Sequence, residues 1–197
     1  MKIHALIGAG LLVALNGLTA SPAAANPHGG FYVGADTGYE GSGRIDQGGV
    51  TYGLFAGYNL AVSDKVILGI EARVGDSEID ETLTRTTPTF TTVTRNAIGL
   101  HYGAAARMGY ALSKRTLVYA RGGWENVRLR SVSTRTSVPP TTGPNPVVTD
   151  ASFNDDTLVV GAGVEHRITD TIGLRLSYDY GENFDRHQVR AGVVFAF

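Results

Sequence analysis

Cysteine is absent from the 197-residue chain, and the formal net charge is close to zero at -1. Without cysteine there is no disulfide framework, no thiolate chemistry and no lipoprotein anchor. No basic stripe runs along the sequence, which argues against a nucleic-acid partner. The length suits a single domain.

Long apolar runs are also lacking beyond the N-terminus. There, Lys2 precedes an apolar stretch over 3–15, and Ala23, Ala24 and Ala25 form a small-residue cleavage site. This pattern predicts that residues 1–25 are a secretory signal peptide, cut before Asn26. The alternative is an uncleaved membrane helix, but such a helix needs about 20 apolar residues. We expect residues 26–197 to form one mature domain.

From Phe31 onward, apolar residues alternate with polar residues or glycine, and this period of two indicates β-strands. Eight segments show the alternation, near 31–40, 50–59, 66–75, 95–110, 118–125, 158–167, 172–180 and 188–197. All six prolines of residues 26–197 lie outside these segments, as expected because proline cannot donate to a strand ladder.

The connections between the segments alternate in length. Tight turns are predicted at 61–65, 111–115 and 169–171, and longer loops at 40–49, 76–94, 129–155 and 181–186. Short turns at one end and long loops at the other are typical of membrane barrels. The sequence therefore predicts an all-β fold, an eight-stranded antiparallel up-and-down transmembrane β-barrel, in which the first and last strands pair.

Alternation alone does not decide which set of side chains faces the barrel interior, because a soluble ligand-carrying barrel also alternates but places its apolar set inside. The polar set here contains no lysine; Lys65 and Lys114 both fall at tight turns. It uses arginine in near balance with carboxylates, and arginine suits confined, bidentate ion pairs. Turning such charges to lipid would cost roughly 2–4 kcal/mol for each arginine near the midplane. We therefore predict a lumen ion-pair network, structural or pore-lining, of Asp36, Glu40, Glu71, Arg73, Arg95, His101, Arg107, Arg121, Glu125, Glu165, Arg167, Arg175, Asp179 and Arg190.

Glycine and aromatic residues support the same facing. Glycine falls mainly in the polar set, where it leaves room for long side chains inside a narrow barrel. Aromatic residues of the apolar set lie near the segment ends, as in the two girdles of a membrane barrel, and Tyr102 departs from this by falling mid-segment. The predicted girdles are Phe31, Tyr58, Tyr110, Phe195 and Phe197 at the periplasmic rim, and Tyr39, Tyr52, Trp124, Tyr178 and Tyr180 at the outer rim.

Several stretches resemble the small eight-stranded outer-membrane proteins of Gram-negative bacteria, namely the OmpA-type membrane domain and the opacity-type "porin family" barrels. They are residues 30–34 (GFYVG), 161–165 (GAGVE), 175–180 (RLSYDY) and the alternating end at terminal Phe197. The resemblance implies a bacterial outer-membrane location with termini in the periplasm. It also implies that the barrel-assembly machinery reads the end at Phe197, and that lipid and lipopolysaccharide surround the barrel. Because the sequence ends with the last predicted strand, we do not expect cell-wall tethering through a peptidoglycan-binding domain such as that of full-length OmpA.

For function, the sequence favours a non-enzymatic barrel that contributes to envelope integrity or to surface interaction through its loops. A low-conductance porin for small solutes or ions is the alternative, although eight strands usually enclose a filled interior. An enzyme is not expected, since neither His101 nor Ser177 belongs to a recognisable catalytic motif. No cofactor and no metal site is predicted.

Two of the predicted loops have distinctive compositions. Residues 76–81 carry Asp76, Glu78, Asp80 and Glu81, which indicates either a solvated acidic loop or divalent-ion contact at the lipopolysaccharide surface; the spacing does not match an EF-hand. The segment 129–155 is rich in threonine, serine and proline. It is interpreted either as a mobile loop or as a binding surface for a host or phage ligand.

Overall fold

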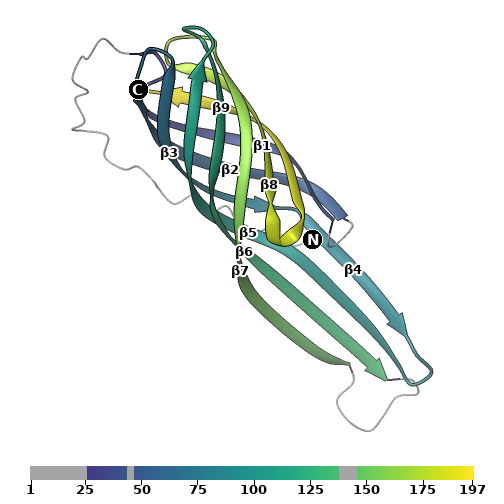
Figure 1. Cartoon of the computed structure of the whole chain (residues 1–197). Coiled ribbons are helices and arrows are strands. Elements are labelled where there is room, and N and C mark those ends of the chain that lie inside the picture. Colours follow the sequence, from purple (N-terminus) through teal and green to yellow (C-terminus); the bar gives the residue numbers. More distant parts are fainter. Residues whose placement is uncertain (1–25, 44–46, 138–145) are drawn as a thin grey trace.

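A computed structural model describes residues 26–43, 47–137 and 146–197, so the predicted signal peptide lies outside the described residues. Among the described residues, no helix has the length and apolar character needed to cross a membrane. The chain is almost entirely β-strand (Figure 1). The strands are β1 (Gly30–Ser42), β2 (Gln47–Ala61), β3 (Val66–Ser77), β4 (Ile79–Thr86), β5 (Phe90–Ala111), β6 (Thr116–Ser137), β7 (Val147–Arg167), β8 (Ile172–Gly181) and β9 (Arg186–Ala196), with the short 3-10 helix η1 (Glu182–Phe184) before β9.

Eight of these strands close into an antiparallel up-and-down barrel. Each pairs with the next along the chain, β3 pairs with β5, and β1 pairs with β9 from Tyr32↔Ala196 to Ser42↔Arg186. The predicted fold class and the predicted pairing of first and last strands are therefore confirmed. Closure matters in a membrane because it leaves no unpaired backbone edge facing hydrocarbon.

The three tight turns and both ends of the described chain lie together, at what we call the turn end. The side chain of Asn26 donates to the backbone oxygens of Ser63 and Asp64 in the β2–β3 turn. At the other end of the chain, the Phe197 amide donates to the Phe31 carbonyl. The N-terminal residues and the last strand are thus fixed to the same rim.

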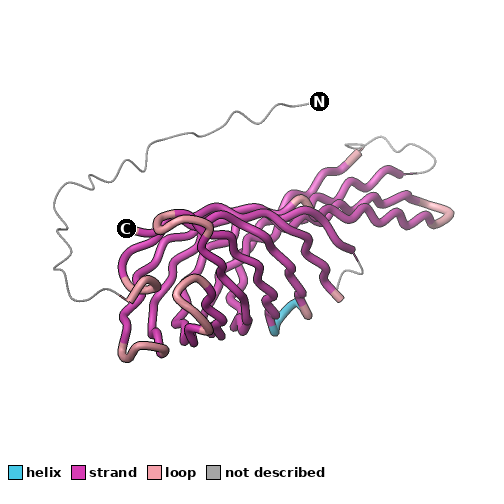
Figure 2. The backbone as a smooth tube through the Cα atoms, turned by 90° about the horizontal axis from the view of Figure 1, so that it is seen from above, coloured by secondary structure: helices cyan, strands magenta, loops and turns pink. Residues whose placement is uncertain are grey.

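At the opposite end, which we call the sheet end, β4, β5, β6 and β7 continue past the barrel as one projecting sheet (Figures 1 and 2). β4 pairs with β5 from Ile79↔Ile98 to Thr86↔Thr91, and β6 pairs with β7 as far as Arg135↔Val147. The predictions that 76–94 and 129–155 are loops are therefore wrong for most of their length. Runs of threonine, valine and serine continue the strands, since β-branched residues favour extended backbone.

The side chains divide between the two barrel faces as the inverted pattern requires. Outward apolar side chains are exposed, for example Ile70 at 68% and Leu176 at 52%. Inward polar side chains are buried, for example Arg190 at 1% and Glu40 at 0%. A water-soluble barrel has the opposite distribution, so the outer face of this barrel is suited to apolar surroundings.

Inward glycines accommodate large inward side chains. A Cβ atom at Gly163 would lie 2.5 Å from the Tyr119 ring, and one at Gly57 would collide with the Tyr32 ring. Both tyrosines are buried in the lumen. The glycines of the polar set therefore provide the space that the narrow interior needs.

Candidate functional site in the barrel lumen

The lumen is filled by arginine and carboxylate side chains. Because side chains alternate along a strand, each strand places its polar set on the same inner surface. Among the described residues, six guanidinium groups form ion pairs with six carboxylates there. They belong to Arg73, Arg107, Arg121, Arg175, Arg186 and Arg190, and to Asp36, Glu40, Glu71, Glu125, Glu165 and Asp179.

Glu71 is the hub of the half nearer the turn end. Its carboxylate accepts hydrogen bonds from Arg175 NH1 at 2.7 Å, from Arg121 NH1 at 3.0 Å and from the Tyr32 hydroxyl at 2.9 Å. Arg107 NH1 lies 3.4 Å from the same carboxylate. One buried acid on β3 thus connects strands from all around the barrel wall.

A second carboxylate, Glu165, completes this half. It accepts from Arg107 NH2 at 2.7 Å and from Arg175 Nε at 2.9 Å. The Arg175 guanidinium also stacks on the Phe55 ring, with its Cζ atom 3.9 Å from the ring centroid. Stacking covers the flat faces of the guanidinium while its edges donate hydrogen bonds.

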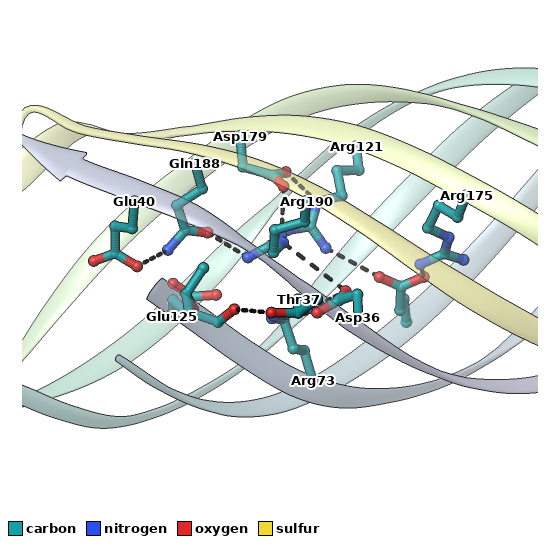
Figure 3. A network of polar contacts seen from close by, with 12 residues as sticks. Asp36, Thr37, Glu40, Arg73, Arg121, Glu125, Arg175, Asp179, Gln188 and Arg190 are labelled. Atoms are coloured by element: carbon teal, nitrogen blue, oxygen red, sulfur yellow. Dashed lines mark hydrogen bonds and ion pairs between the residues drawn. The ribbon is translucent and has the colours of Figure 1, made fainter. Parts of the chain in front are cut away.

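The network continues toward the sheet end, where Figure 3 shows its members pointing at one another. Arg121 connects the two halves, because its Nε lies 2.5 Å from an Asp179 oxygen while its NH1 reaches Glu71. Asp179 also pairs with Arg190, and Arg73 binds both oxygens of Asp36.

The last members lie close to the rim of the sheet end. Gln188 donates to Glu40 at 2.6 Å and accepts from Arg190. Arg186 pairs with Glu125 and lies 3.7 Å from Glu40. The described polar network therefore runs from Glu165 to this rim without a break.

Unpartnered polar atoms are concentrated in this second half. Among the described residues, nine buried side-chain atoms lack a hydrogen-bond partner. Seven belong to His101, Arg186, Arg190, Arg73 and Glu40, and both ring nitrogens of the fully buried His101 are among them. Buried polar atoms normally have a hydrogen-bond partner, so this half has donors and acceptors that could still bond to small polar molecules such as water.

Apolar side chains close the network at both ends. At the sheet end, Ile79, Ile98 and Val127 form a buried cluster with Leu129 packed against it. At the turn end, Ile67, Ala111 and Leu117 form another. A cavity of about 20 Å³, lined in part by His28, Asn59, Glu165 and Arg167, remains at the turn-end mouth. That volume is close to the space of one water molecule.

The structure brings most of the predicted lumen residues together, with one clear error and one peripheral member. Arg95 is not in the lumen: its side chain is exposed on the projecting sheet and pairs with Asp80. A register shift between Ile98 and His101 turns Ile98 inward, and this bulge reverses the facing of the preceding residues. Arg167 lies half-buried at the turn-end mouth and donates to the Asp170 carbonyl.

Sequence reasoning missed several lumen residues, among them Arg186, Gln188 and Phe55. Arg186 was assigned to a loop but is a fully buried partner of Glu125. Gln188 lies in the predicted segment 188–197 but was not among the predicted network residues, although its side chain donates to Glu40. Phe55 was placed in neither set, although it lies inside against Tyr32. The alternation of Arg186, Gln188 and Arg190 was the available signal for the first two.

Nine of the ten predicted girdle residues are exposed on the outer surface, and Tyr180 is partly covered. Phe31 and Tyr58 are neighbours across β1 and β2 near the turn end, with ring centroids 4.6 Å apart. Tyr102, which departs from the girdle pattern in the sequence, lies beside Trp124 with ring centroids 6.0 Å apart. Tyr102 therefore shares an aromatic contact with a predicted outer-rim residue.

The chemistry of this site is ion pairing. In the described residues no group of three or more histidine or acidic side chains is arranged to hold a metal ion. His101, which is fully buried, has no hydrogen bond to a described nucleophile or acid. What the geometry provides is a cross-linked, charge-balanced plug.

Comparison with protein families now identifies the chain. The family described as "Outer membrane protein beta-barrel domain" matches residues 10–197. The chain belongs to this family. It is therefore an outer-membrane barrel, and the exposed apolar belt of the barrel is its lipid-facing surface.

Three solved structures are similar to this outer-membrane barrel at low sequence identity. The attachment invasion locus protein Ail of Yersinia pestis is 12% identical, with a TM-score of 0.48, over 85% of this chain and 99% of that chain. Neisserial surface protein A is 17% identical, with a TM-score of 0.46, over 85% and 97%. The N-terminal barrel of Pseudomonas aeruginosa OprF is 16% identical, with a TM-score of 0.44, over 86% and 99%. A comparison with curated proteins finds no match.

Proposed function

We propose that this protein is a sealed, non-enzymatic outer-membrane barrel that contributes to envelope integrity and presents its projecting sheet for surface interaction. The observation that supports it is the buried network of six guanidiniums and six carboxylates. Opposite charges that are paired across the lumen occupy the path that a solute would take. Barrels with aqueous channels have about twice as many strands.

Planar-bilayer recording of the refolded protein tests the seal. We expect no reproducible single-channel steps from the native sequence. Regular steps would instead support a low-conductance porin, the second candidate. That candidate is favoured by the unpartnered atoms of His101 and Arg186, since polar groups without protein partners are suited to contact with water.

The proposed orientation places the termini in the periplasm and the projecting sheet outside the cell. The support is the contrast between tight turns at one end and long paired strands at the other. Trypsin added to intact cells tests it. We expect cleavage in the projecting sheet at Arg85 or Arg135, and protection of Lys65 and Lys114 in the tight turns. Cleavage confined to the turns would reverse the orientation.

The proposed partners follow from this placement. Outer-membrane lipid and lipopolysaccharide surround the exposed belt, and the barrel-assembly machinery reads the last strand ending at Phe197. Deleting Phe197 should slow assembly of the heat-modifiable folded form in cells. Absence of a catalytic role is tested by incubating the refolded barrel with lipopolysaccharide and phospholipid, where no acyl-chain release is expected.

A further inference from the structure

The projecting sheet ends in a strand with one unpaired edge. β6 pairs with β7 along its whole length from Thr116↔His166 to Arg135↔Val147, but β8 pairs with β7 only from Val159 onward. The η1 turn covers the next two positions, because Asn183 donates to Thr157 Oγ1 and to the Asp156 carbonyl. No described strand lies beside residues 147–155 on that side.

The backbone of this edge points its hydrogen-bonding groups outward at alternate residues. The Asp156 carbonyl faces the open side, since it accepts from Asn183 there and not from β6. Backbone N–H and C=O groups of one strand residue point to the same side, and this side alternates along the chain. Asn154, Ser152 and Asp150 therefore present their N–H and C=O groups to the open edge. Such a row is a template for one more strand.

Charge along the projecting sheet indicates which strand fits. The projecting parts of β5 and β6 carry only cations among their charged residues: Arg95, Arg128, Arg130 and Arg135. The edge of β7 carries only anions: Asp150, Asp155 and Asp156. β6 and its neighbour β7 thus have opposite charge, and Arg130 binds both oxygens of Asp150 across them, at 3.1 and 2.5 Å.

We propose that the open edge of β7, residues 148–155, binds an extended, basic polypeptide segment as an added strand. The inference rests on the proposed function, because it names the partner that the projecting sheet takes. The added strand would carry charge opposite to that of β7, as β6 does on the other side, with its cations near Asp155 and Asp156. Main-chain hydrogen bonds supply the affinity, and the carboxylates select the sequence.

A second copy of this chain fits the edge less well. Pairing two β7 edges would bring aspartates together, and like charges across a strand pair are destabilising. β4 carries Asp80 and Glu81 near the barrel and a single cation, Arg85, near its far end, so a β7–β4 pairing between two molecules places two strands of net negative charge side by side. The acidic edges therefore disfavour self-association and leave a basic strand as the partner.

The test uses the refolded full mature chain in nanodiscs and a fluorescent ten-residue peptide of alternating lysine and threonine. We expect the lysine peptide to bind at least about tenfold more tightly than the same peptide with glutamate. Ser152→Pro removes one outward N–H and leaves the β6 ladder intact, so it should weaken binding about tenfold. Ser152→Ala keeps that N–H and should bind as the native protein does.

Thr84→Pro on β4 is the matched control for the opposite edge. The Glu78 amide donates to Val50 on the side away from β5, so by alternation Thr84 faces the open edge of β4. We expect Thr84→Pro to leave binding unchanged. Heat-modifiable migration on gels shows that each variant is folded.

Three outcomes would overturn the proposal: no binding of the lysine peptide, equal binding of the glutamate peptide, or full binding by folded Ser152→Pro. Cross-linked dimers of the native protein without peptide would reassign the edge to self-association. Peptide binding in nanodiscs depends on neither conduction nor orientation. If the barrel were sealed and oriented as proposed but bound no peptide, this inference would be wrong and the proposed function would remain supported.

Discussion

The lumen and the projecting sheet use the same arginine–carboxylate chemistry in opposite surroundings. In the lumen, Arg107 and its partner Glu71 have side-chain exposures of 1% and 2%. On the sheet, Arg130 and Asp150 have 62% and 48%. Water screens the exposed pair, whereas the buried groups have only one another. We therefore expect the buried pairs to contribute more to folding stability than the exposed pairs.

The largest expected effect is at the hub of the lumen. Glu71→Gln removes the charge shared by Arg107, Arg121 and Arg175, and breaking a buried ion pair typically costs about 3–5 kcal/mol. Urea unfolding in lipid vesicles, followed by Trp124 fluorescence, measures this loss. The sheet variant Asp80→Asn is the control. Equal effects of the two variants would abolish the contrast between the regions.

Next in size is a change on the lipid face. Leu176→Arg places a cation on the exposed belt, where the expected cost is about 2–4 kcal/mol. Leu176→Phe keeps the position apolar and should assemble normally. The yield of heat-modifiable folded protein reports the difference. If the arginine variant assembled as well as the phenylalanine variant, Leu176 would not face hydrocarbon.

A smaller effect concerns pH at the turn end. Burial lowers the pKa of His28 below its ordinary 6.5, although its hydrogen bond to the Ser113 carbonyl opposes this. The unfolded chain then takes up a proton more readily, so folding stability should fall as pH drops below about 6.5. His28→Gln should flatten this part of the pH profile of unfolding. A profile unchanged by the substitution would assign the pH dependence to other groups.

The smallest effect is expected on the projecting sheet. Asp80→Asn breaks the exposed pair with Arg95, and surface pairs contribute at most about 1 kcal/mol. Unfolding measured at low and at high salt should give nearly the same result for this variant. A loss comparable with that of Glu71→Gln would mean that the sheet supports the barrel.

Much of the barrel could be predicted because membrane strands alternate strictly between lipid and lumen. That pattern sufficed to assign the inward sides of Glu71, Arg107 and Arg175 without knowing their partners. It failed at Arg95, because the bulge between Ile98 and His101 reverses which side chains face inward in the part of β5 that precedes it. Arg186 was missed for another reason: it is the first residue of β9, directly after the η1 turn, and the predicted loop 181–186 included it although it alternates with Gln188 and Arg190.

The sequence by itself determined the number of barrel strands, their facing and the balance of charge inside, since these follow from residue alternation and from the cost of arginine in lipid. Only the tertiary structure decided which arginine meets which carboxylate and where the barrel stops. Ion-pair partners come from strands far apart in the chain, as with Arg175 and Glu71. The position of the barrel rim cannot be located from the alternation of residues, because β5, β6 and β7 continue across it as strands.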